Sequence, residues 1–146
     1  MRHSLFLVLY LSFLLSACQI PRDPENTTAK VRGSVLQVGV LSDGLPDSDR
    51  GVIETLARRL DARPEYHTGS AHRLLEGLKV GELHVLTGSI PGSTPFSRHV
   101  GKSNSYGPPI PTAQGAKPRV LLIRRGENQF LMELNRSVQA VKRSGG

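Results

Sequence analysis

Small polar side chains and one arginine follow the predicted strands of this chain, where they could bind a ligand. Asp43 follows the first predicted strand and Ser70 the second. Ser89, Thr94 and Arg98 follow the third. Hydroxyl and backbone groups bind polar atoms, and the planar guanidinium of arginine donates two parallel hydrogen bonds to a carboxylate. We therefore expect these five residues to hold a small polar or carboxylated ligand.

Catalytic and metal-binding patterns are weak in this sequence. No two histidines have the i, i+4 spacing of a helical zinc site, and Cys18 is the only cysteine. Ser89 lacks the Gly-x-Ser-x-Gly setting of a nucleophile elbow. Asp43, Asp47 and Asp49 crowd one loop, but no glycine and distal glutamate complete a calcium-loop pattern. The sequence therefore predicts a binding protein and not an enzyme, with no metal and no cofactor.

Strands and helices are predicted to alternate in the first half of the chain. Apolar and β-branched runs indicate buried strands, and apolar residues at helical spacing indicate amphipathic helices. Such an order favours a parallel sheet, whose ligands bind beyond the carboxyl ends of the strands. The predicted strands are 35–41, 64–68 and 83–87, and the predicted helices are about 51–61 and a second one from its N-cap Ser70 to Gly81.

The second half of the chain is predicted to begin with a connector rich in proline and glycine, residues 101–118. A strand at 119–124 and an amphipathic helix from Phe130 to Val141 follow it. Residues 34–146 are then expected to form one α/β domain with three layers. Its sheet would be mostly parallel, with about four strands and helices on both faces.

The amino-terminal residues resemble a bacterial lipoprotein signal. A basic start and an apolar run lead to Leu15-Ser16-Ala17-Cys18, the layout of a secretory signal that ends at a lipidated cysteine. The alternatives are an uncleaved membrane helix and a buried core helix. The resemblance implies a signal peptide at 1–17, lipidation of Cys18, a flexible tether over residues 18–33 and a place in the cell envelope. Gln19, instead of aspartate, slightly favours the outer membrane over the inner membrane.

The basic character of the chain does not indicate a nucleic-acid partner. Its formal net charge is +7 at pH 7. The Lys and Arg residues are scattered, without a dense run or interleaved aromatic residues. We expect them to be solvated at a surface near anionic lipid and cell wall.

Four stretches of the chain, and the order in which they occur, resemble the extracellular solute-binding proteins of bacterial transporters that bind amino acids. The stretch 35–40 with Asp43, Gly51 and Glu54 is similar to the family's opening strand, ligand loop and first helix. The stretches 74–88 and 94–106 are similar to the segment around its Gly-Glu-Leu-Asp-Val motif and to the approach to its second lobe. Residues 120–146 are similar to its return strand and closing helix.

The departures from the family pattern bear on function. His84 stands where the family has aspartate, Ser105-Tyr106 replaces Pro-Tyr, and Arg98 is out of register with the ligand arginine. A connector of about a dozen residues replaces the second lobe, so the chain resembles lobe one alone. Two-lobed binders bury their solute by closing. A single lobe is therefore expected to bind weakly unless a partner or a second copy covers the solute.

The resemblance implies a lipid-anchored protein that binds a small polar solute, such as an amino acid or carboxylate, next to an ABC transporter or another envelope protein. The alternative is a structural or interaction lipoprotein that uses the fold without a ligand. A third reading, a cell-wall enzyme, lacks a catalytic domain in this sequence.

Overall fold

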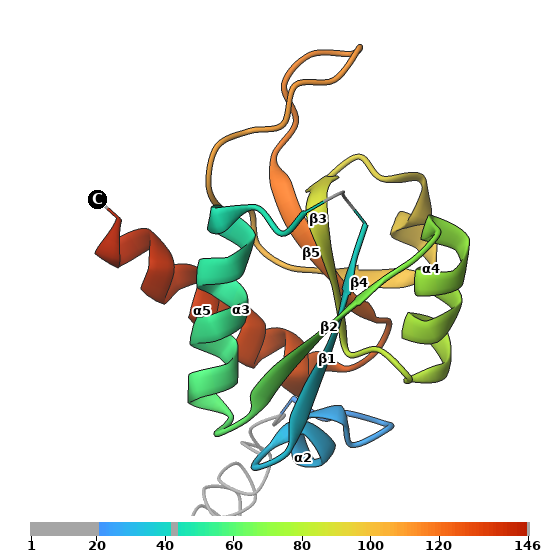
Figure 1. Ribbon diagram of the computed structural model, residues 1–146, viewed down its shortest axis with the longest axis vertical. Helices are drawn as coiled ribbons and strands as arrows, with labels where there is room; N and C mark the ends of the chain where they lie inside the picture. The colour runs from blue at the N-terminus through green and yellow to red at the C-terminus, as the bar shows by residue number, and fades with distance from the viewer. Residues whose placement is uncertain (1–20, 42–43, 146) are drawn as a thin grey trace, which may run out of the picture.

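A five-stranded sheet forms the centre of the molecule (Figure 1). The computed structural model describes residues 21–41 and 44–145. The strands lie in the order β2-β1-β3-β5-β4, and only β5 runs opposite to the others. Their bounds are β1 Val35–Val40, β2 Arg63–Thr68, β3 Val85–Pro91, β4 Val100–Lys102 and β5 Arg119–Arg124.

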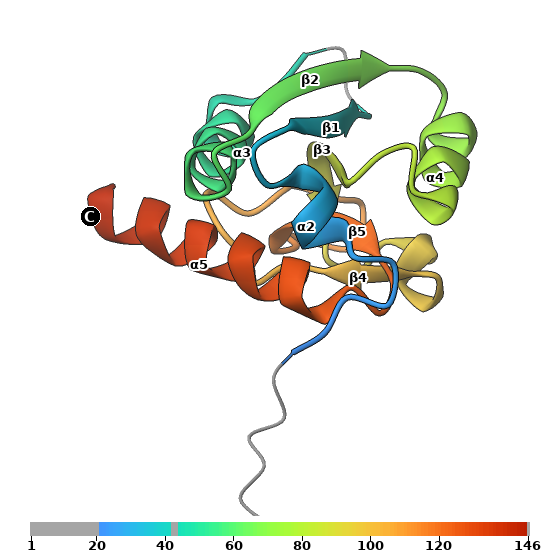
Figure 2. The ribbon, with the colours of Figure 1, turned by 90° about the horizontal axis from the view of Figure 1, so that it is seen from below.

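Helices cover both faces of this sheet, as Figures 1 and 2 show. One face packs on α3 and α5 through a core that includes Leu36, Ile53 and Phe130. The other face packs on α4 through a core that includes Leu78 and Leu122. The helices are α2 Thr27–Val31, α3 Asp47–Arg59, α4 Ala71–Val80 and α5 Asn128–Ser144, with a 3₁₀ turn η1 at Pro95–Arg98.

The predicted fold class is confirmed, because the chain forms one α/β domain with a mostly parallel sheet between two helical layers. Two predicted caps are also confirmed: the Ser70 side chain accepts a hydrogen bond from the Arg73 amide, and Gly81 ends α4 with a φ of 82°. The sheet has five strands where about four were expected. The additional strand, β4, is only three residues long and begins just before the predicted connector, so it leaves no periodic signal.

Helix α3 begins four residues before its predicted start. The stretch Asp47-Ser48-Asp49 has the composition of a loop, but acidic side chains are also favoured in the first turn of a helix, where they face the positive end of its dipole. The apolar residues of α3 point into the core at the predicted helical spacing. The loop after β1 is therefore shorter than expected, and Asp49 belongs to a helix.

The described part of the predicted tether, residues 21–33, is folded onto the domain. Asp23 accepts hydrogen bonds from the Thr28 amide at 2.9 Å and, with its other oxygen, from the Phe130 amide at 2.9 Å. Glu127 accepts from the amides of Glu25 and Thr27 at 3.1 and 3.2 Å. These two carboxylates thus cap α2 and α5 reciprocally. The polar composition predicts a flexible tether, but Asp23 of this segment and Glu127 before α5 hold the segment on the domain.

The described part of the connector is also partly ordered. Ser103 and Tyr106 are buried, and Ile110 pairs with Lys117 in an isolated antiparallel bridge. The segment between these two residues projects from the body of the domain in Figure 1. Among the described residues, no helix is both long enough and apolar enough to cross a membrane.

His84 joins β1 to the start of β3 in its neutral form. Its Nδ1 atom accepts a hydrogen bond from the Gln37 amide at 3.0 Å, and its ring meets Phe130 edge-on. Burial, together with the nearby charge of Lys30, lowers the pKa of His84 below its usual 6.5.

We expect the free energy of unfolding to fall as the pH drops below 6.5. In that range His84 is protonated in the unfolded chain but stays neutral in the folded chain, because folding lowers its pKa. His84→Asn keeps a side-chain acceptor for the Gln37 amide but does not titrate. Urea unfolding of both proteins between pH 7.5 and 5 checks this. An equally steep decline in the variant would contradict the role of His84.

Candidate functional site

The carboxyl ends of the parallel strands lie at one edge of the sheet, and the chain returns to this edge at the start of β5. Val40 ends β1 and Thr68 ends β2. Arg119, the first residue of β5, pairs with Pro91 at the end of β3, because these two strands are antiparallel. The sheet therefore places an arginine from the second half of the chain among the loops of the first half.

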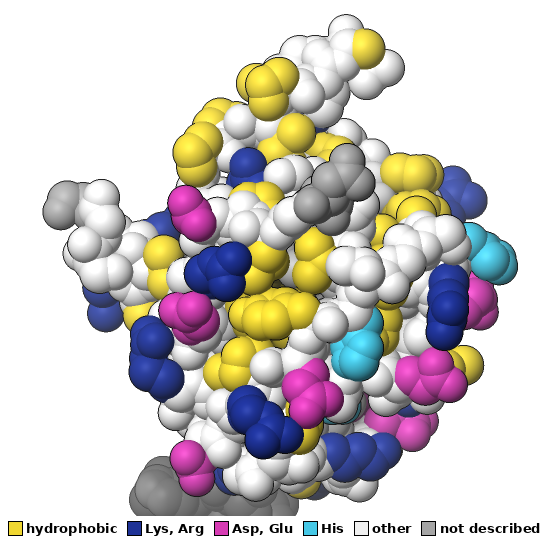
Figure 3. All heavy atoms as spheres, in the orientation of Figure 1, with side chains coloured by type: hydrophobic (Ala, Val, Ile, Leu, Met, Phe, Trp, Pro, Cys, Tyr) yellow, Lys and Arg dark blue, Asp and Glu magenta, His cyan; other side chains and the backbone are white. Residues whose placement is uncertain are grey.

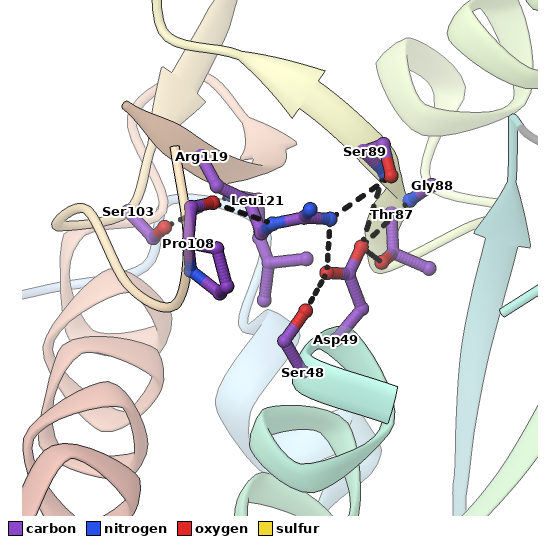
Figure 4. Close-up of polar contacts among 9 residues, drawn as sticks. All are labelled: Ser48, Asp49, Thr87, Gly88, Ser89, Ser103, Pro108, Arg119 and Leu121. Atoms are coloured by element: carbon purple, nitrogen blue, oxygen red, sulfur yellow. Dashed lines mark hydrogen bonds and ion pairs between the residues drawn. The ribbon is translucent and has the colours of Figure 1, made fainter. Parts of the chain in front are cut away.

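Asp49 lies at the centre of a polar cluster at this edge (Figure 4). Its side chain is fully buried. Oδ2 accepts hydrogen bonds from the Thr87 hydroxyl at 2.6 Å and from the amides of Gly88 and Ser89 at 3.0 and 3.2 Å. Oδ1 accepts from Arg119 Nη1 at 3.0 Å. Helix α3 thus supplies a carboxylate that ties the end of β3 to the start of β5.

The donors around Asp49 outweigh the cost of burying its charge. Burial by itself raises the pKa of this carboxyl, but the hydrogen bonds from Thr87, Gly88 and Ser89 hold the pKa below its usual 3.8. Two amides, the hydroxyls of Ser48 and Thr87, and a guanidinium form the kind of donor set that binds a free carboxylate. Here the bound carboxylate is the chain's own.

The middle of β3, just beyond its pairing with β1, is distorted in a way that creates this donor set. The pairing of β3 with β5 shifts register between Leu86 and Ile90, and Ser89 has a φ of 57°. A left-handed backbone is uncommon for serine and marks a strained turn. The turn directs the amides of Gly88 and Ser89 at Asp49, while the Ser89 hydroxyl accepts from Arg119 Nη1 at 2.9 Å.

Tyr106 closes the cluster from the side of the connector. It is 2% exposed, and its hydroxyl has no hydrogen-bond partner of good geometry among the described residues. Burial and the neighbouring Asp49 carboxylate strongly raise the pKa of this phenol, so it stays protonated. The ordered connector therefore helps to seal Asp49 from water.

A hollow of about 550 Å³ opens at the same edge, beyond the ends of β1 and β2. Figure 3 shows the molecule in the orientation of Figure 1. Hydrophobic side chains gather near the middle of the visible face, with basic side chains beside them. This volume lies in the range of small-molecule sites. The hollow is lined by Val40, Leu41, Gly44, Leu45, Arg50, Tyr66, Thr68 and Gly69.

A second hollow, of about 590 Å³, lies along α5. Its residues come from α5, from Arg59 of α3 and from Asn104 after β4, and none of them follows β1, β2 or β3. In open α/β sheets, ligands bind beyond the carboxyl ends of the strands. We therefore take the hollow beside β1 and β2, here called the edge hollow, as the candidate site.

Comparison with solved protein structures identifies the fold of this chain. No family model matches the sequence, and no curated protein matches it. Among solved structures, a point variant of the arginine-bound form of domain 1 from TmArgBP has a TM-score of 0.64 and 18% identity, over 75% of this chain and 92% of that chain. The chain has the fold of one lobe of a periplasmic binding protein.

Two further solved structures agree with this lobe fold. The ancestral amino acid-binding protein AncCDT-1, a precursor of cyclohexadienyl dehydratase, matches with a TM-score of 0.63 and 12% identity, over 76% of this chain and 90% of that one. The substrate binding protein of an amino acid ABC transporter matches with a TM-score of 0.61 and 10% identity, over 76% and 94%. At these identities the likeness shows the fold.

The lobe brings together only some of the residues predicted to bind a ligand. Ser89 belongs to the Asp49 cluster. The side chains of Ser70 and Thr94 cap α4 and η1, respectively. Arg98 is exposed, and its carbonyl accepts a hydrogen bond from Arg125, just past the end of β5 and thus at the opposite edge of the sheet. The ligand roles of Ser70, Thr94 and Arg98 stay predictions.

Two predicted residues lie outside the described part of the chain. These are Asp43, in the loop after β1, and Cys18, the predicted lipidation site. Within the described ranges, no group of three or more histidine or acidic side chains could hold a metal ion.

Four residues of this edge were missed by sequence reasoning. The sequence pattern places Asp49 in a solvated loop and Arg119 at the start of a strand, and it predicts no contact between them. Tyr66 lies on β2, an edge strand whose side chains are mostly exposed, and Arg50 lies in the first turn of α3. One signal was available for Arg119: it begins the predicted strand 119–124, and the first residue of a strand that is antiparallel to its neighbour lies beside that neighbour's carboxyl end.

Proposed function

We propose that this protein is a lipid-anchored, one-lobe solute-binding protein of the cell envelope, which binds a small polar solute in the edge hollow. The position of that hollow, beyond the carboxyl ends of β1 and β2 in a periplasmic-binding lobe, carries the proposal. The arginine-bound form of domain 1 from TmArgBP supports it, since it is a single domain described with a bound amino acid. The proposed role is binding, not catalysis.

Anchoring through Cys18 is proposed from the sequence, and the geometry of the lobe is compatible with it. Glu25 pairs with Arg124 at the end of β5, so the amino-terminal segment meets the domain at the edge opposite to the edge hollow. A lipid attached at Cys18 would leave that hollow facing away from the membrane. This orientation suits a solute arriving from the periplasm, and an ABC transporter or another envelope protein as the partner that receives it.

A thermal-shift screen of the purified chain against amino acids, polyamines, sugars and small carboxylates tests the proposal. We expect a dose-dependent rise in Tm with one chemical class, because a ligand that binds only the folded state stabilises it. Tyr66→Ala should weaken that solute's binding about tenfold, because the side chain lines the hollow and offers apolar area to the solute.

The matched control is Leu131→Ala, which trims an apolar side chain of the α5 hollow. Its solute affinity should equal that of the wild type. Tyr66 is 39% exposed on an edge strand, so its replacement should change stability little. The proposal fails if no solute shifts Tm, or if Tyr66→Ala leaves affinity unchanged.

One observation favours the alternative, an interaction lipoprotein without a solute. The donors at the end of β3 already bind Asp49, so part of the edge is satisfied without a ligand. This alternative predicts that an envelope protein co-purifies with the chain and that substitutions in the edge hollow leave the complex intact.

A further inference from the structure

The Asp49 cluster limits where a solute could place its own carboxylate. The amides of Gly88 and Ser89 both donate to Asp49, and Arg119 Nη1 donates to Asp49 and to the Ser89 hydroxyl. A second carboxylate here would have to displace a fully buried, ionised side chain that is fixed on α3. The end of β3 is therefore closed to the acidic group of a solute.

Arg50 is the cation that the edge hollow offers instead. Its side chain lines the hollow, and the residue is exposed. No ion pair of Arg50 with another described residue is present, whereas Arg119 is engaged by Asp49. A guanidinium that no acidic side chain among the described residues engages retains its capacity for a bidentate contact with a carboxylate.

The remaining walls of the hollow are largely apolar. Leu41, Leu45 and Tyr66 provide aliphatic and aromatic surface, and Thr68 adds a hydroxyl. None of the eight described residues that line the hollow is acidic. Glu54 influences the Tyr66 phenol but does not line the hollow. The described walls thus carry one guanidinium and no carboxylate.

We propose that the solute is a small carboxylate with an apolar or aromatic body, whose carboxylate binds Arg50 while its body packs on Tyr66, Leu41 and Leu45. This assignment rests on the proposed function, since it names the class of solute for the same hollow. It separates this lobe from the arginine-bound domain that shares its fold.

Calorimetric titration of the full chain, purified in mild detergent, tests the assignment with four probes: phenylacetate, acetate, phenethylamine and arginine. Phenylacetate should bind, and acetate, which lacks the apolar body, should bind at least tenfold more weakly. Phenethylamine, which carries an amine in place of the carboxylate, should not bind. Arg50→Gln should weaken phenylacetate about tenfold, the usual effect of losing one charge-assisted pair.

Arg58→Gln is the matched control, because it removes the same charge from the outer face of the same helix, where Arg58 contacts Thr55. It should bind phenylacetate like the wild type. Equal loss in both variants, or no loss in Arg50→Gln, would overturn the role of Arg50. Binding of arginine in preference to phenylacetate, lost in Asp43→Asn, would overturn the solute class and leave the proposed function standing. If no solute of the wider screen bound either, the proposed function itself would fall.

Discussion

Asp49→Ala is expected to lower the free energy of unfolding by about 3–5 kcal/mol, the usual cost of removing one partner from a buried ion pair. The substitution leaves the Arg119 guanidinium without its carboxylate and leaves the amides of Gly88 and Ser89 without an acceptor. The strained turn at Ser89 loses the side chain that holds it. Urea denaturation at pH 7 measures the change.

Asp49→Asn is the informative control, because it keeps the size of the side chain and one acceptor oxygen but removes the charge. It should lose less stability than Asp49→Ala. The low pKa of Asp49 also predicts a pH dependence: its stabilisation is complete above 3.8 and is lost as the pH falls through the lower folded-state pKa. If Asp49→Ala melted like the wild type, the cluster would not hold this edge together.

Asp23→Ala is expected to cost about 2–3 kcal/mol, because hydrogen bonds to buried charged groups contribute more than neutral ones. Asp23 accepts from the amides of Thr28 and Phe130, and also from the Thr28 hydroxyl. Its loss would uncap both α2 and α5. Urea denaturation, with hydrogen exchange of the Phe130 amide as a local probe, measures the effect.

Glu25→Ala provides the comparison from the same segment. Glu25 is half exposed and pairs with Arg124 at 3.5 Å, so its removal should cost less than about 1 kcal/mol. Similar stabilities for Asp23→Ala and Glu25→Ala would mean that residues 21–33 attach only loosely. That result would restore the predicted tether and contradict the reciprocal caps.

Periodic apolar residues made the main elements of the fold predictable. The apolar run 35–41 predicts β1, and the leucines before Gly81 predict α4. Burial of one face of an element imposes a repeat of apolar residues in its sequence. Elements fixed by polar contacts gave no such repeat. The order of residues 21–33 depends on contacts of Asp23 and Glu127 that join residues 107 and 100 positions apart in the sequence. Strand β4 depends on pairing with β5 and not on its own composition.

The sequence predicts that a site lies at the carboxyl edge of the sheet, but it predicts only some of the residues that meet there. Residues that follow a strand in sequence are easily assigned to this edge, and Ser89 does contribute to the cluster there. Arg98 also follows β3 in the sequence. However, η1 carries the chain to the edge of the sheet opposite the carboxyl ends of the parallel strands, and Arg98 lies there. Asp49 and Arg119 meet across 70 residues, and no local pattern encodes that contact.

This lobe is proposed to bind its solute in the edge hollow. Backbone amide shifts in a ¹H–¹⁵N NMR titration, using the solute with the largest thermal shift, test it most directly. We predict the largest changes at Leu41, Tyr66, Thr68 and Gly69, which line the edge hollow. Changes concentrated at Asn135 and Gln139 would contradict the claim and move the site to the hollow along α5.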